Sequence, residues 1–150
     1  MKGRFRGQSE HMLDAKGRII FPGRYRDVLE QNGAPILMVV PWGTCLRAYP
    51  IDEWETFEDK LMENINSPRV EKFVRQCAGR AVECPIDKQG RILLPANLRA
   101  AVGLEKEIIL SGMLRWVEIW DKATAEKVNE EVGESFEDIK NATLAQIGNY

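Results

Sequence analysis

A stretch of thirteen residues occurs twice in this chain. Asp14–Arg26 reads DAKGRIIFPGRYR and Asp87–Arg99 reads DKQGRILLPANLR, with six identical positions. Unrelated stretches of ordinary composition share about one position in thirteen. The similarity extends upstream, where Glu10 matches Glu83. An internal repeat constrains the architecture strongly, because both copies are expected to adopt the same local structure.

Each copy predicts a strand, a tight turn and a second strand. The expected strands cover residues 8–13, 18–21, 81–86 and 91–94. Asp14 and Asp87 suit the start of the turn, because an aspartate side chain accepts hydrogen bonds from nearby backbone N–H groups. Gly17 and Gly90 supply the positive φ that closes a hairpin. We therefore interpret these four residues as the ones that shape the turns.

A short helix and a second hairpin complete each copy. Pro22 and Pro95 end the preceding strand and can open a helix, where a missing N–H costs little. Apolar residues then recur at the i, i+3, i+4 spacing of a short helix, namely Tyr25, Val28 and Leu29 in one copy and Leu98, Ala101 and Val102 in the other. The second hairpins are expected within 35–50 and 107–120, each followed by a further helix.

These segments suggest four parts. They are a first repeat (4–63), a helical linker (64–79), a second repeat (80–133) and an acidic C-terminal tail, expected to be helical (134–150). One repeat of this size cannot bury its apolar face alone. We therefore predict an α+β fold in which two tandem β units with short helices pack about a pseudo-two-fold axis.

The charge of the chain is unevenly distributed. The formal net charge is −2, which taken alone argues against a nucleic-acid partner. However, residues 1–26 carry seven basic and two acidic side chains, whereas residues 118–150 carry three basic and eight acidic ones. This asymmetry suggests a basic working face and an acidic tail, although two solvated surfaces without a partner would also explain it.

Packing in the core does not explain why both copies have an arginine at this position, since charged side chains are rarely buried. Arg18 and Arg91 lie four residues after Asp14 and Asp87, so a salt bridge within the turn is one role for them. The other role is contact with DNA, because a guanidinium fits guanine O6 and N7 and also fits a phosphate. The two roles are compatible, since an aspartate can orient an arginine that also contacts DNA.

Further basic residues surround the two turns. Arg24, Arg26 and Arg99 lie at the start of the short helices, and Lys16 and Lys88 lie in the turns. We interpret them as candidate phosphate contacts, which position a protein on DNA without reading its sequence. For Arg24 a solvated-surface role is an equal alternative.

The motifs of common enzymes and metal sites are missing from the sequence. It has no Walker loop, no G-x-S-x-G and no metal-ligand spacing, and the single histidine, His11, falls on an expected strand. We therefore expect no enzymatic activity, no catalytic residue, no cofactor, no metal and no small-molecule substrate. Cys45, Cys77 and Cys84 form no C-x-x-C pair, which favours buried free thiols in a reducing compartment.

Nothing in the sequence suggests a membrane. No apolar run approaches the roughly 20 residues of a membrane span. The N-terminus MKGRFRGQSE is basic but lacks the apolar segment of a signal peptide. We expect a cytoplasmic protein.

The two turns resemble those of a known family. DAKGRIIFP and DKQGRILLP look like the D-x-x-x-R motif of the MraZ proteins, which are part of the AbrB-like (SpoVT-AbrB) swapped-hairpin superfamily. The stretches AYPIDEWE and VEIWD also resemble this family, and the resemblance covers roughly residues 4–145. It implies that the two β units are swapped-hairpin units of the AbrB-like kind.

The resemblance also implies a function. MraZ proteins are bacterial transcriptional regulators of the division and cell-wall gene cluster, which bind short repeated sites upstream of their own gene and assemble into rings. Carried over, it implies that Arg18 and Arg91 contact double-stranded DNA, and that the chain is a nucleoid-associated homo-oligomer. The alternative is an antitoxin-like module of the same superfamily, whose acidic C-terminal segment binds another protein; such chains usually carry one hairpin motif.

Overall fold

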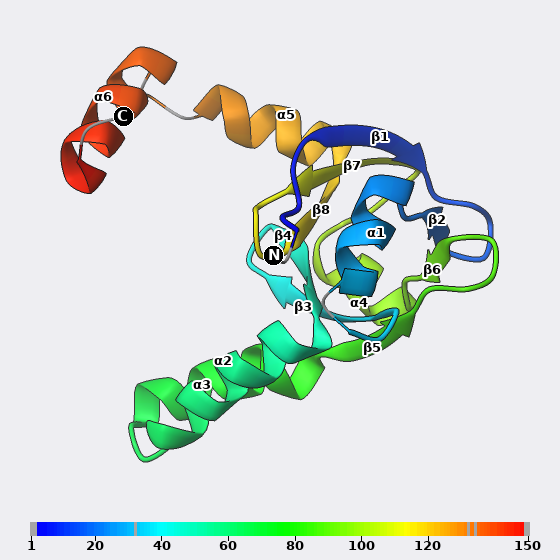
Figure 1. The fold of residues 1–150 in the computed structure, drawn as a ribbon, viewed down its shortest axis with the longest axis horizontal. Helices are drawn as coiled ribbons and strands as arrows, with labels where there is room; N and C mark the ends of the chain where they lie inside the picture. The colour runs from blue at the N-terminus through cyan, green and yellow to red at the C-terminus, as the bar shows by residue number, and fades with distance from the viewer. Residues whose placement is uncertain (1–2, 32, 132, 134, 149–150) are drawn as a thin grey trace.

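The computed structural model describes residues 3–31, 33–131, 133 and 135–148 (Figure 1). The first half of the chain contains β1 (Gln8–Met12), β2 (Arg18–Ile20), α1 (Gly23–Gln31), β3 (Ile36–Trp42), β4 (Cys45–Pro50), α2 (Ile51–Glu63) and α3 (Pro68–Gln76). The second half contains the 3-10 turn η1 (Ala78–Arg80), β5 (Val82–Pro85), β6 (Arg91–Leu93), α4 (Ala96–Ala101), β7 (Glu107–Gly112), β8 (Val117–Asp121), α5 (Lys122–Glu131) and α6 (Phe136–Ile147). The predicted α+β class is confirmed.

Strands from the two repeats interleave within one antiparallel sheet. Its order is β1-β7-β8-β4-β3-β5, and β2 pairs with β6 in a separate two-stranded ladder. Strands β1, β3 and β4 of the first repeat correspond to β5, β7 and β8 of the second. When every strand is replaced by its counterpart, the result is the same order read from the opposite edge. The first strand of each repeat pairs with the other repeat, β1 with β7 and β5 with β3. The predicted pseudo-two-fold packing is therefore confirmed.

The strands beside each turn do not pair with each other, which corrects the expectation of a local hairpin. The turn itself is closed, because the Gly17 N–H donates to the Asp14 carbonyl at 3.0 Å. Beyond the turn, however, β1 joins β7 while β2 joins β6. In the second ladder Ile19 lies directly opposite Ile92, and both side chains are buried. This exchange places the one inward side chain of each three-residue strand in the shared core.

The sheet carries apolar side chains on both faces. On one face, α1, α4 and the β2–β6 ladder cover the main core, to which Tyr25 and Leu98 contribute from the helices. On the other face, a second cluster gathers around Trp54 of α2. All three cysteines are free and buried, as expected from the sequence. Burial raises the pKa of the Cys84 thiol to about 12 and so keeps it protonated.

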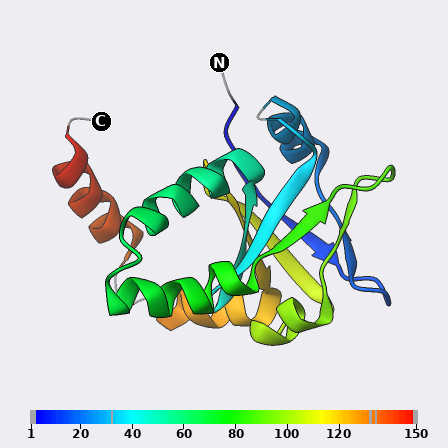
Figure 2. The same ribbon diagram turned by 90° about the horizontal axis from the view of Figure 1, so that it is seen from below.

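Helices α2 and α3 lie far from the turns. Figures 1 and 2 show α2 and α3 running side by side at one side of the molecule, with the turns before β2 and β6 at the opposite side. The start of α5 is set by Asp121, whose Oδ2 accepts a hydrogen bond from the Thr124 N–H at 3.4 Å. Within the described part of the chain, no helix has the length and apolar character that crossing a membrane requires.

Candidate nucleic-acid interface

Each turn is organised by its aspartate. Asp14 Oδ1 accepts hydrogen bonds from the backbone N–H groups of Lys16 and Arg18, both at 2.9 Å, and Oδ2 accepts from Arg18 Nε at 2.7 Å. Asp87 makes the same three contacts, with Gln89 N and Arg91 N at 2.9 Å and with Arg91 Nε at 3.0 Å. The duplicated D-x-x-G-R sequence therefore produces duplicated geometry.

These contacts stabilise the ionised form of the aspartates. The backbone N–H of Arg18, followed by its side chain and the Lys16 N–H, lowers the pKa of Asp14 from its ordinary value of 3.8 to about 2. The pKa of Asp87 is lowered for the same reasons, with the Arg91 N–H first. Both carboxylates are therefore charged at neutral pH, and each holds the Nε side of an arginine fork.

The two arginines lie on the outward face of the β2–β6 ladder. Arg18 is opposite Leu93, and Arg91 is opposite Ile20. Because side chains alternate along a strand, these four residues share the face away from Ile19 and its partner in the core. The arginine side chains are 29% and 26% exposed, so they are neither locked inside nor fully solvated. Ile20 and Leu93 are exposed large apolar residues.

Sequence reasoning missed Ile20 and Leu93 as members of this surface. The period-two alternation of a strand would have found them, because each lies two positions from the arginine of its own strand. Together the four side chains present two guanidinium groups and two aliphatic groups on one small ribbon.

Arg26 and Arg99 brace the turns of the opposite repeat. Arg26 Nε donates to the Phe21 carbonyl at 3.0 Å, and Arg99 Nε donates to the Leu94 carbonyl at 2.9 Å. A methyl group added at Gly90 would lie 2.8 Å from Arg26 Cζ, and one added at Gly17 would lie 2.9 Å from Arg99 Nε. The turn glycines thus provide both the positive φ predicted from the sequence and room for an arginine from the other repeat.

The other basic candidates differ in their surroundings. Lys16 and Lys88 are exposed in the turns. Arg24 instead donates to the carbonyls of Arg6 and Gln8, both at 3.3 Å, and its guanidinium lies 5.0 Å from the centre of the Tyr25 ring. Arg24 therefore ties α1 to the start of β1, a role the sequence did not suggest.

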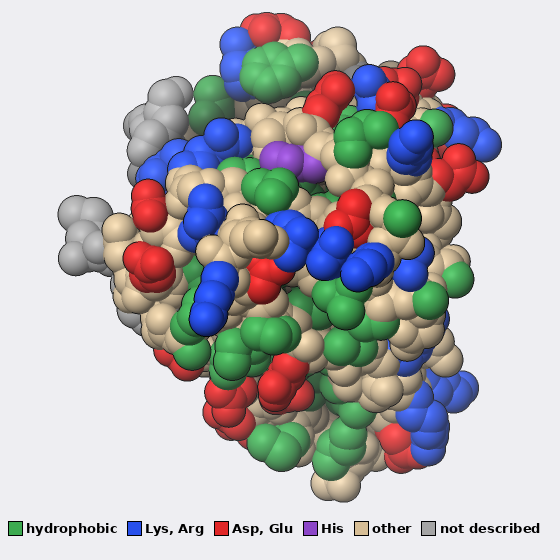
Figure 3. Space-filling view, turned by 90° about the vertical axis from the view of Figure 1, so that its right-hand side faces the viewer, with side chains coloured by type: hydrophobic (Ala, Val, Ile, Leu, Met, Phe, Trp, Pro, Cys, Tyr) green, Lys and Arg blue, Asp and Glu red, His purple; other side chains and the backbone are tan. Residues whose placement is uncertain are grey.

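A basic surface results from this arrangement. Figure 3 looks onto the side of the molecule that carries the turns and shows Lys and Arg side chains gathered across its middle, with some acidic side chains among them and apolar side chains beside them. Guanidinium and ammonium groups on such a surface can bind phosphates, and the arginine forks can also donate to base edges.

Comparison with known proteins gives a consistent result. The model of a family described as "MraZ protein, putative antitoxin-like" matches the chain twice, over residues 4–76 and 77–147. A protein named transcriptional regulator MraZ from Desulforapulum autotrophicum is 44% identical over 146 residues, which is 96% of this chain and 99% of the relative. Proteins of the same name from Pediococcus pentosaceus (44% identical, 90% of this chain and 93% of the relative) and Syntrophobacter fumaroxidans (44%, 80% and 81%) are also similar.

Proposed function

The chain belongs to the MraZ family, and on this basis we propose that it regulates transcription by binding double-stranded DNA through its two D-x-x-G-R turns. The shared name of the relatives supports a role in transcription rather than in catalysis. The proposal for DNA contact rests on the geometry of this chain.

The observation that carries the proposal is the outward face of the β2–β6 ladder. A two-stranded β-ribbon fits the major groove of B-DNA, and an arginine fork can donate two hydrogen bonds to guanine O6 and N7. Asp14 and Asp87 hold Arg18 and Arg91 through Nε, so each fork is oriented before DNA arrives. Apolar side chains beside the arginines suit contact with thymine methyl groups.

Lys16 and Lys88 are the best placed phosphate contacts, because both are exposed in the turns that flank the ribbon. Arg26 and Arg99 each donate to a carbonyl of their own repeat and lie against the turn glycine of the other repeat. Their main contribution is to keep the two turns in place, with their positive charge added to the surface. Arg24 is held by the carbonyls of Arg6 and Gln8, so in this proposal it contributes positive charge and no specific contact.

The proposal includes an assembly. We propose that the chain is a homo-oligomer, in the form of a ring, that binds short repeated sites upstream of its own gene in the division and cell-wall gene cluster. Several copies of a basic surface with individually weak affinity then bind a repeated site with high avidity. The protein would work at the nucleoid in the cytoplasm.

Binding of the Arg18→Ala and Arg91→Ala variants to the DNA upstream of the protein's own gene tests this function. Loss of a bidentate arginine contact costs about 1–3 kcal/mol, so each single variant should bind roughly 5- to 150-fold more weakly. Arg75→Ala is the matched control, because Arg75 lies on α3 and pairs with Glu71. Circular dichroism checks the fold, and undiminished binding by the double variant would contradict the proposal and favour an antitoxin-like protein-binding module.

A further inference from the structure

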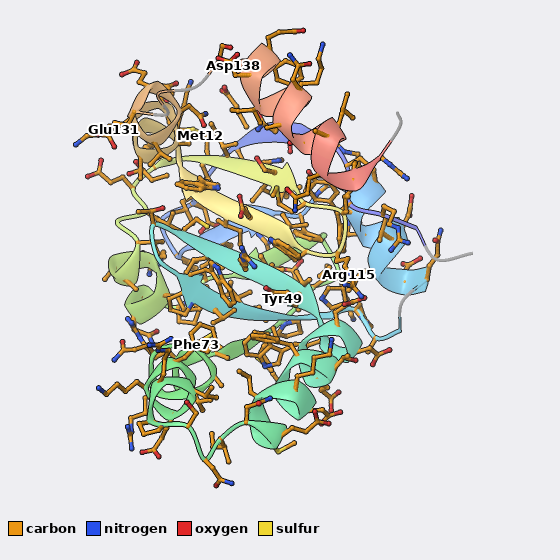
Figure 4. All side chains as sticks on the ribbon, turned by 90° about the vertical axis from the view of Figure 1, so that its left-hand side faces the viewer. Met12, Tyr49, Phe73, Arg115, Glu131 and Asp138 are labelled. Atoms are coloured by element: carbon orange, nitrogen blue, oxygen red, sulfur yellow. The ribbon has the colours of Figure 1, made fainter. Side chains whose placement is uncertain are left out.

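A second surface with an unusual composition lies on the far side of the sheet from the turns. A groove of about 300 Å³ opens there between the sheet, α2 and α3. Its walls include the aromatic rings of Trp42, Phe57, Phe73 and Trp116. Its charged lining residues are Arg47, Lys60, Arg115 and Glu53, and Glu53 Oε2 lies 3.5 Å from Arg115 Nε. Figure 4 shows Tyr49, Arg115 and Phe73 around this region, with α3 below the sheet.

Arg47 lies between two aromatic rings at the base of this groove. Its guanidinium carbon is 4.0 Å from the centre of the Trp42 ring and 4.3 Å from that of Trp116. Arg47 Nε and Trp116 Nε1 are buried and have no hydrogen-bond partner among the described residues. Arg47 Nε also lies 3.9 Å from Glu118 Oε2, so the charge left for an occupant of the groove is mainly that of Lys60 and Arg115. The groove therefore combines apolar walls with an excess of positive over negative side chains. An occupant that suits it is apolar on one side and acidic on the other.

The chain itself contains a segment of this kind. Helix α6 has no buried residue, and its exposed apolar side chains are Phe136 (76% exposed), Ile139 and Ile147. Glu137 and Asp138 form its acidic first turn, and Glu137 Oε1 pairs with Lys140 Nζ at 2.8 Å. An isolated helix of this length is marginal in water, so most of its stability must come from packing against a partner.

The two halves of the molecule differ at this point. In the first repeat α3 follows α2 and packs back, with the Phe73 ring 5.5 Å from the Trp42 ring and 6.1 Å from the Phe57 ring. Beside α5 the corresponding cavity is lined by Glu118 and Trp120, and no lysine or arginine lines it. The charges of the two cavities therefore favour the groove beside α2 over the cavity beside α5 for an acidic helix turn.

We propose that α6 of one copy docks into the groove beside α2 of a second copy, with Phe136 among the aromatic rings and Glu137 and Asp138 facing Lys60 and Arg115. The inference rests on the homo-oligomer in the proposed function and assigns the contact that builds it. Each copy offers one helix and one groove, so the contact is head-to-tail, and successive copies can close into a ring.

Charge reversal tests the docking. In a groove variant (Lys60→Glu, Arg115→Glu) or a helix variant (Glu137→Lys, Asp138→Lys), light scattering should show the mass falling toward the 17.1 kDa monomer. Phe136→Ala keeps the charges and the helix and should weaken assembly at least tenfold, because it removes the apolar anchor. Arg75→Glu, on the same helix pair but outside the groove lining, should keep the wild-type mass.

Mixing separates docking between copies from docking within one chain. The groove variant keeps a normal helix and the helix variant keeps a normal groove, so an equal mixture should recover a mass of two or more chains. If mixing recovers nothing, or if all variants retain the wild-type mass, the docking is wrong while DNA binding through Arg18 is untouched. A monomeric wild-type chain would instead contradict the oligomer on which the inference rests.

Discussion

Arg47 and Glu118 face each other across the pseudo-two-fold axis. They are partners in the β4–β8 ladder, and Arg47 Nε lies 3.9 Å from Glu118 Oε2. Each lies four residues before the helix that follows its strand, so the two occupy equivalent positions in the repeats. A perfectly symmetric sequence would put two like charges or two neutral groups here. The repeats have diverged to opposite charges at the place where they meet.

Removing this arginine should weaken the fold. In Arg47→Met, Glu118 loses its cation in a mostly buried setting, and the two indole rings lose the guanidinium between them. We expect the free energy of unfolding to fall by roughly 2–4 kcal/mol in urea denaturation. The control Arg75→Met removes an exposed pair with Glu71 and should cost less than about 1 kcal/mol. If both variants lose the same free energy of unfolding, the Arg47–Glu118 pair stabilises the fold no more than an exposed ion pair does.

The turn glycines should be intolerant of a methyl group. Gly90→Ala requires a residue at φ +78 and brings Cβ to 2.8 Å from Arg26 Cζ. The left-handed conformation costs about 1–2 kcal/mol, and the displaced arginine adds to this loss. Gly43→Ala has φ +75 with nothing within 4 Å of the new atom, so it should show the conformational cost alone. Thermal unfolding of both variants measures the difference, and a Gly90→Ala variant as stable as Gly43→Ala would rule out the close contact.

The turn aspartates should give the stability a specific pH dependence. The pKa of Asp14 in the folded chain, about 2, is below the ordinary 3.8, so the folded state binds its proton less readily than the unfolded chain. The stabilisation of the fold by the ionised Asp14 carboxylate is therefore complete above about pH 4 and is lost as the pH falls toward 2. The difference in urea midpoint between wild type and the Asp14→Asn, Asp87→Asn variant should shrink over that window. A difference that is independent of pH would contradict this origin.

The salt dependence of DNA binding should distinguish phosphate contacts made by the turn lysines from base contacts made by the turn arginines. The two phosphate contacts proposed for each chain, Lys16 and Lys88, predict a slope of log K against log salt of about −1.8 for each bound chain. Lys16→Ala and Lys88→Ala should each reduce the magnitude of that slope by about 1 while leaving sequence preference intact. Lys72→Ala, on α3, should leave the slope unchanged. A lysine variant that alters sequence preference instead would show that the turn lysines read bases.

Local structure was predictable because it depends on neighbouring residues. The turns follow from Asp14 and Gly17 with their repeats, and the short helices follow from Pro22 and the apolar stripe after it. The exchange of strands was not predictable from these patterns, because β2 has the same alternation whether its partner is β1 or β6. The same limit applies to the bracing of Gly90 by Arg26, since their proximity depends on how two distant segments cross.

The pairing of β1 with β7 also bears on how the chain is made. Gln8 finds its partner in Ser111, so the first strand leaves the ribosome long before the residues that will cover its edge. Until then the nascent protein exposes an unpaired strand that chaperones or proteases can recognise. Translation that stops before β7 therefore leaves a product in which β1 has no partner strand and the sheet cannot close.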